Sequence, residues 1–366
     1  MSLRVAVCGA CPYPVPQGSQ VYLRDTALAL RDAGHAVCLV TYGHGRGDDR
    51  SGLVVHRAPR LPLDGRTEAG PTPVKPLLDL ALARTLRRVV RRERIDVVCA
   101  HNYEALAAAL LARVRPVVYF AHNALADELP HYFGGARWAA RAGAAADRFL
   151  PRRADLVVAA HGRLADYLRA HGCREVAVVP PPVDAAAFPA AVVGDAVPPV
   201  LYTGNLDGYQ NLGLLTEAMA RVRARVPGAR LVVATASARP FPCDERVDTP
   251  GLDALRDVLA RDAVVAAPRV SWSGYPIKLL NAMAAGKAVV ACASAAAPLV
   301  HGETGWVVAD DDAEAYAAGL DRLLTDPALR ERLGRAAREA ALTTHARPRI
   351  GAELSALLRR VCRVSG

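Results

Sequence analysis

The sequence predicts an α/β protein with two doubly wound, Rossmann-like domains, and three observations lead there. The chain has 366 residues, which exceeds one typical core and suits two domains of roughly 150 to 190 residues. Residues 4–41 have the pattern of a strand, a glycine-bearing loop, an amphipathic helix and a second strand, which is a βαβ unit. The same alternation returns from residue 200 onward.

Composition narrows the class of protein. Apolar residues make up 52% of the chain and charged residues 22%, as expected for a packed globular protein. No apolar run approaches the roughly 20 residues of a membrane span, and the first residues have the pattern of a buried strand rather than a signal peptide. We therefore expect a cytoplasmic location, with peripheral placement at the inner face of the plasma membrane as the variant.

The eight cysteines are mostly single and lie among apolar residues, which indicates buried thiols in a reducing compartment. Cys8 and Cys11 form a CxxC pair after the first strand. Such a pair is open to a redox role or to half of a metal site. Because proline follows at once and no second CxxC exists, two buried small residues are the favoured interpretation.

The net charge of +10 is unevenly distributed. Residues 1–190 carry 25 Lys and Arg against 17 Asp and Glu, whereas the remainder is close to balanced. The positive charge of this half predicts an acidic binding partner, either an anionic membrane or a polyprenyl diphosphate. Nucleic acid is not expected, since no nucleic-acid module is present. The arginine-rich helix at residues 84–92 is open to either a solvated face or membrane contact.

One stretch concentrates the chemistry, PRVSWSGYPIKLLNAMAAGKAVVA at residues 268–291. It predicts a loop, a helix from Ile277 that ends at Gly286, and a strand. A helix N-terminus after a Gly/Pro turn favours an anion, and Lys278 adds a full positive charge in the first turn. A diphosphate would suit this position. The alternative is an ordinary crossover with a solvated lysine.

This stretch resembles the donor-binding segment of the GT-B glycosyltransferases, in particular family 4, which is a retaining family. The family pattern has two acidic residues eight positions apart, and here Ser273 and Asn281 stand in their places. The positions that match the pattern are Gly274, Pro276, Leu280, Ala282, Met283, Ala284, Gly286, Val289 and Val290. The resemblance implies a GT-B fold whose two domains face a central cleft.

The resemblance extends along the chain. It implies an acceptor-side domain at 1–190, a nucleotide-sugar domain at 191–345, and a helix at 346–366 that returns to the first domain. The family's arginine and lysine for the donor diphosphate are replaced by Asn205 and Gln210, so Arg269 and Lys278 are the candidate substitutes. The predicted donor-binding residues are Gly18, Gly204, Asn205, Gln210, Arg269, Ser273, Gly274, Tyr275, Lys278 and Asn281.

Two buried strands end in a histidine followed by an asparagine, His101-Asn102 and His122-Asn123. Ligands bind beyond the carboxyl ends of parallel strands, which favours a site over structural histidines. The resemblance implies that His122 contacts the donor sugar, and we predict His122 and Ser273 as catalytic.

The stretch 124–153 mixes aromatic and arginine residues, which suits either an acceptor surface or a packed helix. The predicted acceptor-side residues are His101, Asn123, Glu128 and Arg137. The acidic run at residues 310–312 predicts a helix cap rather than a metal site.

The leading hypothesis is a metal-independent glycosyltransferase that moves a sugar from a nucleotide-sugar to a glycan, polyprenyl-linked or small acceptor. No cofactor is expected besides this co-substrate. Loss of both acidic residues leaves a catalytically degenerate, sugar-binding relative as the alternative. A nucleotide-sugar epimerase of the same architecture is a third option, for which no suitable carboxylates can be placed in the sequence.

Overall fold

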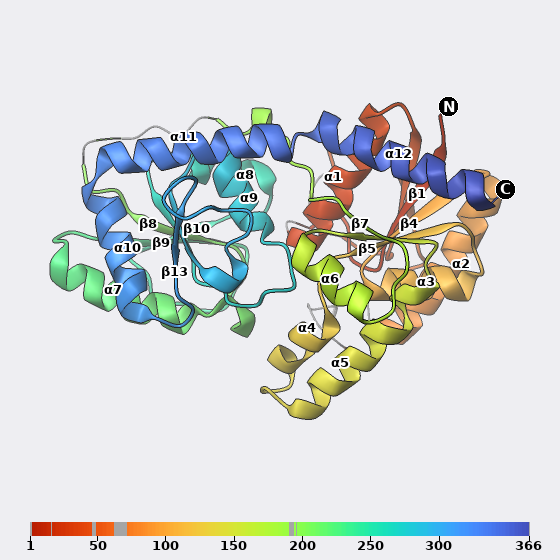
Figure 1. Ribbon diagram of the computed structural model, residues 1–366, viewed down its shortest axis with the longest axis horizontal. Coiled ribbons are helices and arrows are strands. Elements are labelled where there is room, and N and C mark those ends of the chain that lie inside the picture. Colours follow the sequence, from red (N-terminus) through yellow and green to blue (C-terminus); the bar gives the residue numbers. More distant parts are fainter. Residues whose placement is uncertain are drawn as a thin grey trace.

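The computed structural model describes residues 2–15, 17–45, 49–61, 72–189, 194 and 196–365. Two α/β units lie side by side, and the long helices α11 (Pro327–Thr344) and α12 (Arg347–Ser365) run along both of them (Figure 1). Each unit is a parallel sheet with helices on both faces. The predicted α/β class with two doubly wound domains is confirmed.

The first sheet has seven parallel strands in the order β3-β2-β1-β4-β5-β6-β7. The chain winds outward from β1 in one direction and then restarts at β4 on the other side, so a topological switch point lies between β1 and β4. Its strands are β1 (Arg4–Gly9), β2 (Ala36–Thr41), β3 (Val54–Arg57), β4 (Val97–His101), β5 (Val117–Ala121), β6 (Leu156–Ala159) and β7 (Val176–Val178). Its helices are α1 (Gly18–Asp32), α2 (Lys75–Arg92), α3 (Tyr103–Ala112), α4 (Leu125–Tyr132), α5 (Arg137–Phe149) and α6 (Gly162–Ala170).

The second sheet has six parallel strands in the order β10-β9-β8-β11-β12-β13, with the switch point between β8 and β11. Its strands are β8 (Val200–Thr203), β9 (Leu231–Thr235), β10 (Glu245–Asp248), β11 (Val264–Ala267), β12 (Val289–Cys292) and β13 (Trp306–Val308). Helices α7 (Leu212–Arg225), α8 (Leu252–Ala260), α9 (Ile277–Ala284) and α10 (Ala313–Thr325) cover it. Apart from the edge strand β10, which is charged and largely exposed, the strands are short apolar runs because both faces of the sheet are buried.

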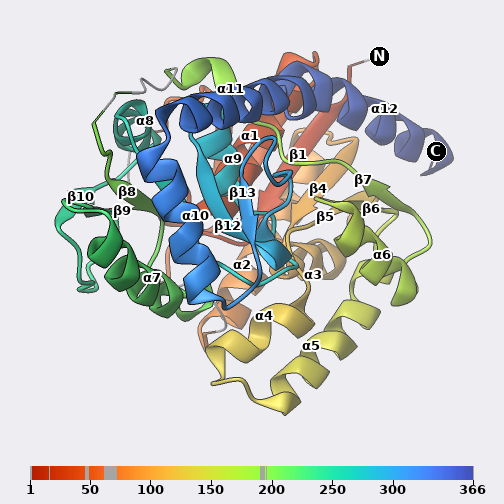
Figure 2. The same ribbon diagram turned by 60° about the vertical axis from the view of Figure 1, so that its left-hand side comes forward.

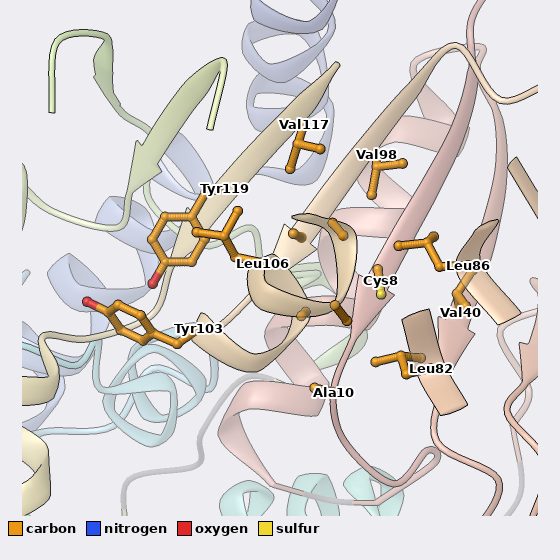
Figure 3. Close-up of a cluster of buried hydrophobic side chains, with 14 of the residues drawn as sticks. Cys8, Ala10, Val40, Leu82, Leu86, Val98, Tyr103, Leu106, Val117 and Tyr119 are labelled. Carbon is orange, nitrogen blue, oxygen red and sulfur yellow. The ribbon is translucent and has the colours of Figure 1, made fainter. Parts of the chain in front are cut away.

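The core of the first unit explains the CxxC pair. Figure 3 shows Cys8 among the aliphatic side chains that separate β1 from α2 and α3. Both cysteines are buried free thiols. Burial raises the pKa of Cys11 to about 12 and that of Cys8 still further, so neither is a reactive thiolate near neutral pH. The structure therefore supports the interpretation as small core residues.

The chain crosses between the units at two neighbouring places. Val183, ahead of β8, pairs with Ala346, which lies between α11 and α12. His345 ties the crossings together, because its Nδ1 donates to the carbonyl of Pro181 at 2.9 Å and its Nε2 accepts from the Tyr275 hydroxyl at 3.1 Å. Beyond this point α12 packs on α1 and buries Ile350, Leu354 and Leu358 in the core of the first unit. The predicted domain boundary between residues 190 and 191 lies outside the described residues.

Two further sequence features are resolved by local contacts. Asp312 caps α10 by accepting from the backbone N–H of Ala315 at 2.9 Å, as predicted, while Asp310 and Asp311 bond Ser294 and Asn211. Throughout the described ranges, no group of three or more His, Cys, Asp or Glu side chains is arranged to hold a metal ion. No helix in the described part of the chain is both long and apolar enough to cross a membrane.

Candidate donor site between the two sheets

The N-termini of α1 and α9 meet where the two units face each other. A Cβ placed on Gly18 would lie 3.6 Å from the Cβ of Ile277, which is ordinary van der Waals contact, so the two helix starts are immediate neighbours. Each helix follows a strand beside the switch point of its own sheet, β1 and β11. Two partial positive charges therefore point into one region, which favours an anionic ligand.

Lys278 provides a full positive charge in this region. Its Nζ donates to the Tyr202 hydroxyl at 3.1 Å and to the side-chain carbonyl of Gln210, and it lies 4.4 Å from the centre of the Tyr202 ring. Gly204 lies beside it with φ of +120°, a backbone conformation that side chains rarely adopt, and a Cβ there would lie 3.5 Å from Nζ. Burial, together with the charge of Arg269, lowers the pKa of Lys278 to about 7. An ammonium held in this environment gains most from an anion that neutralises it.

Arg269 is the second cation and packs against the glycine of the loop. Its guanidinium lies where a Cβ on Gly274 would be, donates to the Ser271 hydroxyl at 3.1 Å, and sits 5.3 Å from the centre of the Tyr209 ring. Among the described residues, its Nε is buried without a hydrogen-bond partner. The structure thus places Arg269 near enough for its charge to act on Lys278, and their role as a rearranged diphosphate site stays a prediction.

Asn205 and Gln210 hold the loop between β8 and α7 in place. Gln210 donates to Asn205 at 2.6 Å, and Asn205 donates to Asp207 at 2.6 Å and to the Tyr209 hydroxyl at 2.9 Å. Both amides are engaged with neighbouring side chains, so they orient the lysine and the tyrosine. Asn281, the replacement for the family's second acidic residue, is 5% exposed on α9.

The two predicted histidines form a pair in the first unit. His101 Nδ1 and His122 Nε2 are 2.9 Å apart and share a proton, and the Tyr22 ring packs against both imidazoles. Burial lowers the pKa of His122 to about 3 and that of His101 well below its usual value. Both rings are therefore neutral near pH 7. His101 is 1% exposed and orients His122, which is the more accessible of the two.

The loop before α9 is fastened to the first unit by a carboxylate. Asp127 Oδ2 accepts from the Ser271 hydroxyl at 2.8 Å, from the Ser273 N–H at 3.1 Å and from the Ser273 hydroxyl at 2.7 Å. His161 donates from Nε2 to the Ser273 carbonyl at 3.0 Å. Ser273 is completely buried by these partners. Its hydroxyl proton is therefore already used within the protein.

Trp272 anchors the same loop on α6. Its ring lies 5.5 Å from that of Tyr167 in an edge-on arrangement and 4.6 Å from the Arg163 guanidinium. The segment 271–273 is thus held against the first unit by the Trp272 ring and by the hydroxyl groups of Ser271 and Ser273.

The remaining predicted site residues do not form a single cluster. Glu128 lies on α4 and accepts from the Tyr132 hydroxyl at 3.2 Å; burial and the nearby Glu104 raise its pKa to about 7. The backbone carbonyl of Asn123 accepts from Tyr103 at 3.3 Å. Arg137 is exposed at the start of α5 and is not joined to the other predicted site residues by any hydrogen bond or ion pair that the structure shows in the described chain.

Tyr275 and Asp127 have contacts in the structure that the sequence did not indicate. The Tyr275 hydroxyl forms a hydrogen bond with His345, so Tyr275 links the candidate donor loop to the place where the chain crosses between the units. Asp127 carried no sequence signal beyond an acidic residue in the first turn of a helix. Tyr22, Tyr202 and Tyr209 also escaped prediction, since tyrosines in strands and helices are ordinary core residues.

Two facing Rossmann-like units with two cations and two helix N-termini between them form an arrangement that suits an anionic ligand. The known proteins that resemble the chain agree. Residues 17–182 match the family model described as the glycosyl transferase 4-like domain, and residues 197–326 match that of the glycosyl transferases group 1. The chain belongs to the GT-B, family 4-like glycosyltransferases, which are enzymes of the hexosyltransferase type.

Individual relatives fit this assignment. The phosphatidyl-myo-inositol mannosyltransferase of Mycolicibacterium smegmatis is 28% identical over 355 residues, with 87% of this chain and 85% of the relative covered. The sucrose-phosphate synthase structure from Thermosynechococcus elongatus has a TM-score of 0.80 at 17% identity over 99% of this chain and all of that one. Anabaena Alr3699/HepE, solved in complex with UDP-glucose, has a TM-score of 0.71 at 17% identity, with 98% of this chain and 100% of that one covered.

Proposed function

We propose that the protein transfers a sugar from a nucleotide-sugar to a lipid-linked, glycan or small acceptor, without a metal ion and with retention of configuration. The observation that carries the proposal is the placement of Lys278 and Arg269 beside the N-terminus of α9. A leaving diphosphate needs positive charge that is fixed before the reaction. Two cations and a helix N-terminus provide it from the protein alone.

The histidine pair completes the proposed donor site. His122 lies beyond β5 and presents a neutral imidazole that can exchange hydrogen bonds with a sugar hydroxyl. His101 holds it at 2.9 Å and sets its tautomer. Glu128, with a pKa of about 7, is a carboxyl on the acceptor side that can take up a proton near neutral pH.

Transfer and donor hydrolysis test the proposal directly. UDP-, GDP-, ADP- and TDP-sugars are incubated with the protein, and the released nucleoside diphosphate is measured by chromatography and mass spectrometry. We expect release from one nucleotide class, with loss of at least tenfold in rate in His122→Ala, because hydrogen bonds to the reacting sugar contribute about 1.5 kcal/mol or more. His171→Ala, in a histidine that contacts Tyr167 at the end of α6, is the control.

A catalytically degenerate relative is the second candidate, favoured by the uncharged Ser273 and Asn281. It predicts binding of a sugar or nucleotide without release of any diphosphate. Release that His122→Ala abolishes excludes it.

Membrane contact is supported by the exposed face of α5. Trp138 is 59% and Phe149 57% exposed, and they continue a stripe with the small residues Ala142 and Ala145. Arg137, Arg141 and Arg148 are exposed beside this stripe. Helices α4 and α5 extend away from the first sheet in both views (Figures 1 and 2). An apolar stripe flanked by arginines is typical of a helix that lies on an anionic bilayer.

Flotation with vesicles tests this contact. We expect binding to vesicles that contain phosphatidylglycerol, weaker binding to phosphatidylcholine alone, and a clear loss in Trp138→Ser. Leu342→Ser removes an exposed apolar residue of α11 and serves as the matched control. Equal flotation of both variants would contradict the contact.

A further inference from the structure

We propose that Asp127 is a donor-binding residue, and that the first unit in this way supplies the carboxylate for the sugar of the nucleotide-sugar that the donor loop of the second unit lacks. The proposal rests on the function proposed above and adds a residue to its site. It starts from the position of Ser273, where the chain has an uncharged side chain in place of an acidic one. The structure places a carboxylate against this very residue, from α4 of the other unit.

The two oxygens of Asp127 differ in their partners. Oδ2 accepts all three hydrogen bonds from the loop, two from hydroxyls and one from a backbone N–H. Oδ1 accepts none from the residues that the structure describes, and the side chain is only partly buried. One oxygen therefore fastens the loop, and the other remains available to accept from a ligand hydroxyl.

The fastened oxygen is connected to the proposed diphosphate site. The Ser271 hydroxyl, which donates to Asp127, itself accepts from the Arg269 guanidinium at 3.1 Å. A short chain thus runs from the carboxylate through one serine to a cation beside Gly274. We infer that a sugar attached to a diphosphate at Arg269 and Lys278 would face the carboxylate at the other end of this chain. The spacing suits a ligand that is negative at one end and rich in hydroxyl groups at the other.

Asp127 is also held on a rigid support. Asp147, which is completely buried on α5, caps the start of α4 by accepting from the N–H groups of Leu125 at 3.0 Å and Ala126 at 3.1 Å. Gly143 lets the two helices approach closely, since a Cβ there would lie 2.4 Å from the Leu125 backbone. A binding group must be positioned before the ligand arrives, and this packing does so.

A mere latch between the units would use the carboxylate differently from a ligand-binding group. A latch contributes equally to every ligand that requires a closed cleft. A sugar-binding carboxylate contributes only when the sugar is present. Comparing a nucleotide-sugar with the corresponding nucleoside diphosphate therefore separates the two roles.

The experiment measures both ligands by calorimetry on the full chain, using the nucleotide class that binds the wild type. In Asp127→Asn and Asp127→Ala we expect affinity for the nucleotide-sugar to fall about tenfold to a hundredfold, as for a lost hydrogen bond to a charged group. Affinity for the nucleoside diphosphate should change less than about threefold. Asp166→Asn, on the exposed face of α6, is the control for a lost acidic residue.

A relocated carboxylate gives a second, independent readout. We expect Asp127→Ala/Ser273→Glu to recover most of the nucleotide-sugar affinity, because the charge returns to the same place from the loop side. Ser273→Glu alone should bind poorly, since two carboxylates would then face each other.

Equal losses for both ligands, or no loss for either, would overturn the proposal and leave Asp127 as a structural latch. Failure of the wild type to bind any nucleotide or nucleotide-sugar is a different result, which refutes the function on which this inference rests.

Discussion

The hydroxyl of Ser273 donates to Asp127 Oδ2 at 2.7 Å and thereby joins residues that are 146 positions apart in the sequence. Ser273 belongs to the loop before α9, and Asp127 to the first turn of α4. The contact links the candidate donor loop of one sheet to the helix pair that extends from the other. The conformation of this loop is therefore linked to the relative position of the two units.

Nucleotide affinity should depend on pH through Lys278. Its pKa of about 7 in the free protein means that above this pH the neutral Lys278 amine must take up a proton when a diphosphate binds. We expect the affinity for the nucleoside diphosphate to fall by up to about tenfold per pH unit from about pH 7 to about pH 9. Calorimetry across this range measures it.

Two variants make this pH test specific. Lys278→Ala should bind weakly with a flat pH profile, whereas Lys75→Ala, which removes a lysine paired with Glu104 at 3.3 Å, should keep the wild-type slope. The account fails on this point if Lys278→Ala retains the slope.

Burial of the Lys278 side chain should also destabilise the folded protein. Its pKa is about 7 in the folded state against 10.5 for an ordinary lysine, so between these values the unfolded chain binds a proton that the folded chain does not. Stability attributable to this residue therefore rises with pH across that window, and the cost is fully present below about pH 7. We expect Lys278→Met to have a higher thermal midpoint than the wild type at pH 7. The difference between the two midpoints should be smaller at pH 9. A lower midpoint at pH 7 would contradict this.

The histidine pair should produce acid sensitivity. The pKa of His122 is about 3 in the folded state and 6.5 in an ordinary environment, so protons bind preferentially to the unfolded chain between these values. Stability is thus lost as pH falls below about 6.5, by at most about 1.4 kcal/mol per pH unit for one proton. Urea unfolding of wild type and His122→Asn from pH 7 to pH 4 should show a shallower loss in the variant. Parallel profiles would exclude a neutral, buried His122.

Asp147 should be among the most sensitive core positions. Its carboxylate accepts from the hydroxyls of Tyr103 at 2.5 Å and Tyr167 at 2.8 Å, besides the two N–H groups at the start of α4. Asp147→Asn replaces one acceptor oxygen by a donor, and we expect it to cost about 2–4 kcal/mol in urea unfolding. Asp166→Asn, in an exposed pair with Arg169, should stay within about 0.5 kcal/mol of wild type. A similar cost for both would refute the role of Asp147.

The fold could be predicted because its signals are local. Except for the edge strands β3 and β10, the β-strands are short apolar runs. Glycines such as Gly34 and Gly286 follow helix ends in the left-handed conformation, with φ of 89° and 70°. His101 and His122 were predicted as site residues because each follows a buried strand. The structure places them 2.9 Å apart, because parallel strands end at one edge of a sheet.

The rest of the site depends on contacts between distant segments. Asp127 meets Ser273 only because α4 is set by Asp147 and the loop by Trp272, and neither relation leaves a spacing in the sequence. The role of Tyr275 likewise follows from the hinge, where its hydroxyl reaches His345. Arg269 and Lys278 could be predicted as cations of the site because both lie within the recognisable donor segment.

Thermal unfolding with UDP-, GDP-, ADP- and TDP-sugars tests the central claim most directly, that a nucleotide-sugar binds beside Lys278 and Arg269. We expect one nucleotide class to raise the midpoint at millimolar concentration, since a ligand at about 100 times its Kd stabilises by about 2.7 kcal/mol. The rise should shrink in Lys278→Ala and in Arg269→Ala but persist in Lys75→Ala. No rise with any of the four classes, or a rise that both site variants retain, would contradict the account.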